Sequence, residues 1–135
     1  MLLQALRFRG KGKLGLSRMC TELLDDRESG LKVGYEATDW TTPVSYEAYC
    51  EAMKDWEVKS VVRDGEIIGA AYFKDDEVHA SILPQWRRRW ATKGIIQELF
   101  ASHRMTKVTP GHEYMYGILT RLGFENQGGG RFVKG

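Results

Sequence analysis

Two short runs that contain β-branched and aromatic residues predict a β-hairpin in the middle of the chain. Residues 59–63 and 66–73 are expected to be strands, with Gly69 inside the second. The Asp-Gly pair at 64–65 favours the tight turn that joins two such strands. A third strand is expected at 77–83, after a turn at 75–76.

This third strand has two faces of different chemistry, because successive side chains of a strand point to opposite sides. One face holds Val78, Ala80 and Ile82, and the other holds Glu77, His79 and Ser81. Pro84 ends the strand, since proline cannot continue a ladder of hydrogen bonds. The strand is therefore expected to lie with one side on the core and the other on a more polar surface.

Apolar residues at helical spacing predict four helices. The segments are Leu16 to Gly30, Tyr46 to Trp56, Ile95 to Phe100 and Met115 to Leu122. Ser45 offers an N-cap for the second helix, and Gly123 closes the last one. Further short strands are expected at 2–8, 107–109 and 131–134, with an irregular stretch at 31–41 and a loop at 128–130.

The order of these elements predicts the fold class. A strand, two helices, three strands and then alternating helices and strands indicate a mixed α/β protein, with about six strands in a central sheet and about four helices around it. A length of 135 residues suits one hydrophobic core. We therefore expect a single domain over residues 1–135.

Composition narrows the class of protein. The chain is 42% hydrophobic and 28% charged, which is typical of a soluble globular protein, and no apolar run approaches the roughly 20 residues that span a bilayer. The first ten residues carry arginines where a secretory signal would be apolar. Cys20 and Cys50 stand alone in predicted helices, so we expect buried free thiols in a reducing compartment, with a bridge between them as the less favoured alternative.

Basic residues are clustered although the net charge is only +2. One run extends from Arg7 to Arg18, and a second cluster holds Arg87, Arg88, Arg89 and Lys93 at the start of the third predicted helix. Arginine is well matched to phosphate oxygens. The second cluster therefore favours phosphate or coenzyme A binding, with contact to nucleic acid or an acidic partner, or a plain solvated surface, as alternatives.

Three segments resemble the GNAT acyltransferases. The hairpin Val61-Val62-Arg63-Asp64-Gly65-Glu66-Ile67-Ile68-Gly69-Ala70 is similar to the paired central strands of that family. Ile82-Leu83-Pro84-Gln85-Trp86-Arg87 is similar to the start of its acetyl-CoA loop, and Leu122-Gly123-Phe124 matches its closing Leu-Gly-Phe signature. The resemblance implies a GNAT-like fold, acetyl-CoA as cofactor and an amine as acyl acceptor.

The same resemblance points to the cofactor-binding residues. They would be Ile82, Leu83, Arg87, Arg88, Arg89, Trp90, Ala91 and Thr92. The family's loop uses small residues so that backbone N–H groups approach the pyrophosphate, whereas Trp90 and Thr92 stand at those two positions here. If Trp90 points into the groove between the two central parallel strands, coenzyme A cannot lie there.

Glu77 and His79 are the candidate catalytic residues, because an acyl transfer to an amine needs a group that removes its proton. The alternative is that both are ordinary strand residues.

Leu119 stands where family members often place a tyrosine that protonates the leaving thiolate, and Tyr114 and Tyr116 lie on other helix faces. His112 is expected near the cap of the last helix. No metal is expected, because the histidines and cysteines lack ligand spacing.

Two functions follow from this pattern. The first is an acetyl-CoA-dependent N-acetyltransferase acting on a small amine or on a protein N-terminus or lysine, with the segment 31–43 helping to select a cationic amine. The alternative is a catalytically inactive module similar to GNAT-like proteins of tailed bacteriophages, one group of which is packaged as an internal virion protein. Its partners would be DNA or other virion proteins, contacted by the basic clusters. We expect no membrane span and a location in the cytoplasm, or in the host cytoplasm or virion for a phage protein.

Overall fold

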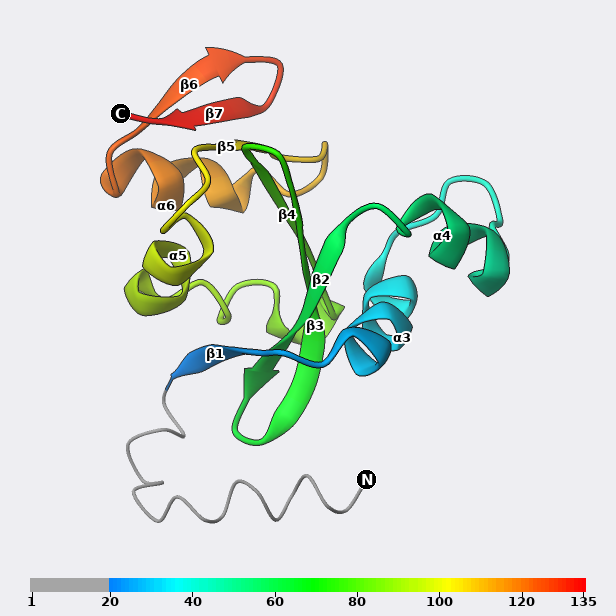
Figure 1. The fold of residues 1–135 in the computed structure, drawn as a ribbon. Coiled ribbons are helices and arrows are strands. Elements are labelled where there is room, and N and C mark those ends of the chain that lie inside the picture. Colours follow the sequence, from blue (N-terminus) through cyan, green and yellow to red (C-terminus); the bar gives the residue numbers. More distant parts are fainter. Residues whose placement is uncertain (1–19) are drawn as a thin grey trace.

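A computed structural model describes residues 20–135, which form four α-helices, one short 3₁₀ helix and seven strands (Figure 1). In chain order the elements are β1 (Thr21–Leu24), α3 (Arg27–Ala37), α4 (Tyr46–Ala52), β2 (Glu57–Arg63), β3 (Glu66–Lys74), β4 (Glu77–Ile82), η1 (Pro84–Trp86), α5 (Lys93–Leu99), β5 (Met105–Lys107), α6 (Tyr114–Arg121), β6 (Phe124–Gly128) and β7 (Arg131–Lys134). The strand expected at 2–8 lies outside the described residues.

All seven strands join one sheet in the order β1-β2-β3-β4-β5-β7-β6. Every neighbouring pair is antiparallel except β4 and β5, which are parallel and share a single register pair, Glu77 with Met105. Helices α3 and α4 lie on one side of the sheet and α5 and α6 on the other (Figure 1). The mixed α/β class predicted from the sequence is confirmed.

The core has two parts because both faces of the sheet are covered. Under α5 and α6, Ile68, Val78 and Ile82 pack with Ile95 and Leu119. Under α3 and α4, a smaller cluster contains Leu31, Tyr49, Val58, Ala70 and Tyr72. Strand β4 contributes its apolar face to the larger cluster, as its alternation predicted.

The central hairpin is confirmed. Asp64 and Gly65 both have positive φ angles, 54° and 78°, as a type I′ turn requires. The ladder between β2 and β3 contains one irregularity, between Val61 and Val62. Asp75 at the next turn also has a positive φ, 54°. These turns place β4 beside β3, where its far edge becomes available to β5.

The prediction for the N-terminal part of the described chain was wrong. Thr21–Leu24 is a strand inside the stretch that was predicted as one helix. Helix α3, Arg27–Ala37, begins within that predicted helix and continues through residues 31–37, where an irregular stretch was expected. The helix contains Gly34, because a Cβ there would lie 2.2 Å from the Tyr72 hydroxyl. Gly30, interpreted as a helix stop, is likewise a close-packing position of α3. Cys20 is exposed, contrary to the buried thiol expected, and both cysteines are free.

At the C-terminal end, three helix and strand predictions are confirmed and two differ. Strand β7 and helices α5 and α6 lie where they were predicted. Strand β5 lies at Met105–Lys107, two residues before its predicted place. Strand β6 was not predicted, since Glu125, Asn126 and Gln127 are all exposed and polar and so show no alternation. It lies at the end of the sheet order, as an edge strand with polar side chains.

Candidate functional site

The gap between β4 and β5 is the candidate site. The two strands meet at Glu77 and Met105 and share no further register pair, so the edge of β4 beyond Glu77 has no strand beside it. A pocket of about 660 Å³ occupies this region. Five consecutive β4 residues, from Val78 to Ile82, line the pocket, although successive side chains of a strand point to opposite faces. The pocket therefore wraps around the open edge of β4 and reaches both sides of the sheet.

On the α3 and α4 side, the pocket wall is largely aromatic. Trp40, Tyr49, Trp56 and Tyr72 all line it. The ring of Trp40 meets that of Tyr49 edge-on, with centroids 5.9 Å apart. On the α5 and α6 side the wall is aliphatic and aromatic core, including Ile96, Leu99, Phe100 and Leu119. An apolar part of a ligand is what such a pocket accommodates best.

The two candidate catalytic residues lie side by side, and one of them lines the pocket. The Nε2 atom of His79 is 3.1 Å from Oε1 of Glu77, and His79 lines the pocket. The edge-on ring of Trp56 packs against His79, with centroids 5.5 Å apart. Glu77 thus fixes the orientation of the imidazole, which is the arrangement that a general base requires.

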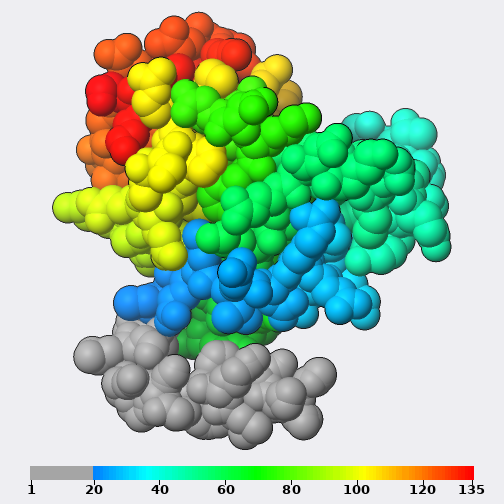
Figure 2. Space-filling model, in the orientation of Figure 1, coloured from blue at the N-terminus to red at the C-terminus, as the bar shows by residue number. Residues whose placement is uncertain are grey.

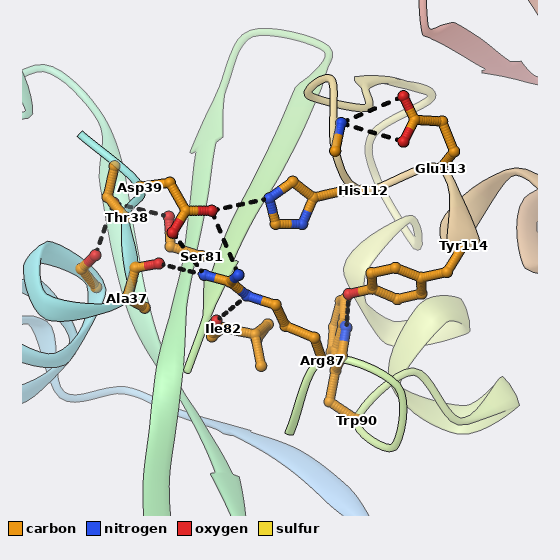
Figure 3. A network of polar contacts seen from close by, with 12 residues as sticks. Ala37, Thr38, Asp39, Ser81, Ile82, Arg87, Trp90, His112, Glu113 and Tyr114 are labelled. Carbon is orange, nitrogen blue, oxygen red and sulfur yellow. Dashed lines mark hydrogen bonds and ion pairs between the residues drawn. The ribbon is translucent and has the colours of Figure 1, made fainter. Parts of the chain in front are cut away.

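Hydroxyl-bearing side chains also line the pocket, and sequence reasoning did not identify them as site residues. Thr38 Oγ1 donates a hydrogen bond to the Gly34 carbonyl at 2.8 Å and lies 3.3 Å from Ser81 Oγ (Figure 3). The hydroxyls of Tyr49 and Tyr72 lie 2.6 Å apart in the interior. Burial raises the pKa of both tyrosines, so both phenols stay neutral. No sequence motif marks them, because they come from separate elements.

Arg87 holds three segments together at the mouth of the pocket (Figure 3). Its guanidinium donates to the carbonyls of Ile82 at 2.9 Å and Ala37 at 2.8 Å, and it pairs with the Asp39 carboxylate at 3.3 Å. His112 Nε2 approaches the same carboxylate at 3.4 Å. Hydrogen bonding to Arg87 is the largest cause of the lowered pKa of Asp39. Arg87, a predicted cofactor ligand, is thus already occupied by protein groups.

The next two predicted cofactor residues, Arg88 and Arg89, are exposed. The Arg88 guanidinium lies over the ring of Tyr114 at 5.5 Å, and that of Arg89 lies over Trp86 at 4.3 Å. Both point away from the core on aromatic supports, and neither forms an ion pair with a carboxylate of residues 20–135. They remain available to an anion.

Trp90 is buried, with 4% of its surface exposed, and it lines the pocket beside β4. Its Nε1 donates a hydrogen bond to the Tyr114 hydroxyl at 3.2 Å (Figure 3). Burial raises the pKa of Tyr114, so the phenol stays neutral in this contact. The indole therefore belongs both to the core and to the wall of the pocket.

The rest of the loop also serves the fold. Thr92 is the N-cap of α5, and its Oγ1 accepts a hydrogen bond from the Ile95 N–H at 3.3 Å. Ala91 is half-buried and packs against the core. Ile82 is buried in the pocket wall, whereas the Leu83 N–H donates to the Ile68 carbonyl at 2.8 Å.

These contacts test whether acetyl-CoA fits. The open edge of β4 and the pocket have room for an extended chain, but the loop has no small residues where the pyrophosphate would approach its amides. At those two positions Trp90 is buried in the core and Thr92 caps the amide of Ile95, while Arg87 is bonded to protein groups. The loop therefore lacks the two small residues through which the family's loop amides approach a pyrophosphate.

The last helix lacks a proton donor at the position that the resemblance implies. Leu119 is 1% exposed and belongs to the core. The ring of Tyr116 packs edge-on against Phe132, with centroids 5.1 Å apart. His112 lies two residues before the start of α6 and faces Asp39, and Glu113 is the N-cap residue. Of the two tyrosines of α6, Tyr114 lines the pocket and Tyr116 does not.

Within residues 20–135, no cluster of three or more histidine, cysteine, aspartate or glutamate side chains has the arrangement of a metal site. None of the helices formed by these residues has both the length and the apolar character needed to cross a membrane.

Comparison with known proteins adds one likeness. No protein-family model matches the sequence, and no curated protein matches it. Among solved structures, the chain is similar to a protein from Desulfovibrio desulfuricans assigned to the GNAT family of acetyltransferases. The two are 13% identical with a TM-score of 0.45, over 84% of this chain and 94% of the other. A likeness at this level does not bear on activity.

Proposed function

We propose that the protein is a non-catalytic binding module built on an acyltransferase-like fold. The observation that carries this proposal is Trp90, whose indole is buried in the core at a loop position where the resemblance implies a small residue. Thr92 and Leu119 support it, since one caps a helix and the other is sealed in the core. The parallel strands β4 and β5 are paired only at Glu77 and Met105, and the loop after β4 packs into the core through Trp90.

This proposal agrees with the resemblance to GNAT-like proteins of tailed bacteriophages, some of which are internal virion proteins. In such a setting the protein would act by contact with other virion proteins or with DNA. The exposed Arg88 and Arg89 are suited to such contacts, since neither pairs with a described carboxylate. Function would then depend on surfaces and not on turnover.

Calorimetric titration with acetyl-CoA tests the proposal. We expect no binding by the natural chain at about millimolar cofactor, which corresponds to a binding free energy weaker than about 4 kcal/mol. The matched variant is Trp90→Gly/Thr92→Gly, which restores the small residues of the family's loop. Binding by the natural chain that is lost in Arg88→Ala would overturn the proposal in favour of an enzyme.

A second function, N-acetyl transfer to an amine, is favoured by one observation. His79 lies on the pocket wall with its imidazole oriented by Glu77 at 3.1 Å. In that function His79 would accept the proton of a small amine, a protein N-terminus or a lysine as the nitrogen attacks the acyl group. The acyl donor would have to lie in the gap without using the loop amides.

Acetylated product detected by mass spectrometry distinguishes the two functions. We expect none above background with polyamines or peptide amines. Thiol-reactive dyes are unsuitable, because Cys20 is an exposed free thiol. Turnover that falls about a hundredfold or more in His79→Ala, with unchanged thermal stability, would establish the enzyme.

A further inference from the structure

Charge is strongly segregated along the chain. Residues 20–77 contain 15 acidic and six basic side chains, whereas residues 78–135 contain nine basic and three acidic ones. The two parts also occupy different regions of the molecule, with the yellow to red residues gathered on one side of Figure 2 and the blue and cyan residues on the other. A net charge of +2 therefore conceals one acidic and one basic side.

The loop after β4 is the most strongly basic part of the second region. No aspartate or glutamate occurs from Val78 to Gln97, while four cations do: Arg87, Arg88, Arg89 and Lys93. Asp39 neutralises only the first of these. The other three are exposed and form no ion pair with a carboxylate of the described residues. Exposed guanidinium and ammonium groups without a carboxylate partner are suited to an external anion.

Aromatic rings hold these guanidinium groups in place. Trp86 has Arg89 over its ring at 4.3 Å and Arg63 at 5.6 Å. Arg63 in turn donates a hydrogen bond to the Arg89 carbonyl at 2.6 Å, which links strand β2 to the loop. Arg88 lies over Tyr114, whose hydroxyl is fixed by Trp90. Stacked guanidiniums lose less rotamer freedom on binding than free ones, so this surface is partly preorganised.

A hollow of about 430 Å³ lies between this loop and the residues before α6. Its lining consists of Pro84, Gln85, Arg87, Arg88, Arg89, Gly111 and Tyr114. None of these side chains is acidic. Arg89 donates one hydrogen bond to the Gln85 carbonyl at 3.4 Å, and neither Arg88 nor Arg89 forms an ion pair with a carboxylate of the described residues. The hollow is concave and basic, which suits the insertion of a phosphate group.

We propose that this basic surface, formed by Arg88, Arg89 and Lys93 on the supports Trp86 and Tyr114, binds the phosphate backbone of a nucleic acid. The inference rests on the proposed function and names the partner of that binding module. A polyanion with regularly spaced charges matches these cations better than a single carboxylate does. The sequence before Cys20 adds five basic residues and no acidic one, which increases the attraction to a polyanion.

Fluorescence anisotropy with a labelled DNA duplex of about 25 base pairs tests the surface, at salt concentrations between about 50 and 200 mM. We expect the logarithm of the association constant to fall linearly with the logarithm of the salt concentration. In Arg88→Ala/Arg89→Ala the affinity should fall about tenfold and the salt slope should shrink by about 2, because each lost phosphate contact removes about 0.9 from it. A melting temperature close to that of the natural chain would show that the fold is kept.

The control is Lys32→Ala/Lys54→Ala, which removes the same charge from exposed positions of the acidic side. Its affinity should stay near that of the natural chain. Equal losses in both double variants, or no DNA binding at about 50 mM salt, would overturn the proposal. So would competition by poly-L-glutamate at equal charge, which would indicate an acidic protein partner. Acetyl-CoA binding in a separate titration would refute the proposed function without changing these outcomes.

Discussion

The indole N–H of Trp90 donates a hydrogen bond to the hydroxyl of Tyr114 across 3.2 Å. This bond connects the loop after β4 to the first residue of α6, on opposite sides of the gap between the parallel strands. Because Trp90 is buried among core residues, the contact ties the loop to α6 and contributes to the core. Trp90 thus gives the loop after β4 a structural role.

Removal of this hydrogen bond should lower the free energy of unfolding slightly, and the effects of removing its two partners should not be additive. Trp90→Phe and Tyr114→Phe should each lower the free energy of unfolding by about 1 kcal/mol, in addition to any packing loss, because a buried polar partner loses its bond. The double variant should cost less than the sum, since neither partner is then left unsatisfied. Urea denaturation of the four proteins measures the coupling, and strict additivity would contradict the contact.

Trp90→Gly removes the packing of this side chain as well as its hydrogen bond. Loss of a buried indole should lower the free energy of unfolding by about 3–5 kcal/mol, as other large-to-small core substitutions do. A loss below about 1 kcal/mol would mean that the side chain is not packed as described. The same denaturation experiment supplies the value.

The sequence predicted the parts of the fold that depend on local signals. The Asp64-Gly65 turn and the alternation in β4 are chemical preferences of neighbouring residues, and both predictions are confirmed. Helix α3 could not be predicted in this way. Gly30 and Gly34 resemble helix breakers in sequence, but they lie in the helix because the sheet approaches too closely for a side chain.

The candidate site was predictable only as far as its strand. The positions of Glu77 and His79 on one face followed from alternation. The ion pair of Arg87 with Asp39 did not, because 48 residues separate them in sequence and only the fold brings them together. The triple arginine was predicted as one basic cluster, yet Arg87 turns inward to carbonyl groups while Arg88 and Arg89 stay exposed.

Gly34→Ala should destabilise the protein markedly, whereas Gly117→Ala should not. A Cβ at Gly34 would lie 2.2 Å from the Tyr72 hydroxyl and 2.9 Å from Ala70 Cβ, so helix α3 would have to move away from the sheet. We expect a loss of about 2 kcal/mol or more. Gly117 in α6 has only the end of a flexible arginine within 4 Å, and alanine there should stabilise the helix by up to about 1 kcal/mol.

Thermal and urea unfolding of these two variants give the comparison. Both substitutions add one methyl group to a helix, so differences in helix propensity cancel to first order. The sign of the change should therefore differ between them. Similar effects at both positions would contradict the close approach of α3 to β3.

Acid should weaken the contact between Asp39 and Arg87. The hydrogen bond from Arg87 lowers the pKa of Asp39 below its usual value of 3.8. A carboxylate with a lowered folded-state pKa contributes stability that is present above the unfolded value and is lost as pH falls through the folded one. The contribution is small because the Asp39 side chain is 67% exposed and solvent screens the pair.

Melting temperatures between about pH 2 and 6 test this point in Asp39→Asn and the natural chain. The natural chain should be the more stable of the two near the upper end of that range, and the difference should shrink toward the lower end. A difference that stays constant with pH would show that the charge of Asp39 plays no part. Arg87 keeps its bonds to the Ile82 and Ala37 carbonyls in either case, so the fold should persist.

The buried pair of tyrosines behind the pocket should respond unequally to substitution. The hydroxyls of Tyr49 and Tyr72 lie 2.6 Å apart, and Ser81 also hydrogen-bonds Tyr72. Tyr72→Phe leaves the Tyr49 hydroxyl without this partner, whereas Tyr49→Phe leaves Tyr72 with Ser81. The first variant should therefore lose more stability, about 1–3 kcal/mol, because an unsatisfied buried hydroxyl pays its full desolvation cost.

Unfolding in alkali tests the burial of Tyr49 and Tyr72 independently. Burial raises the pKa of both phenols, so their neutral forms stabilise the fold below the unfolded value of about 10, and this stability is lost as pH rises toward the folded value. Between about pH 10 and 11.5 the natural chain should lose stability more steeply than Tyr49→Phe/Tyr72→Phe. Absorbance of phenolate, followed together with circular dichroism, should show these two tyrosines ionising only as the protein unfolds. Ionisation of all the tyrosines while the fold persists would mean that the pair is open to solvent. The buried contact between the Tyr49 and Tyr72 hydroxyls would then be contradicted.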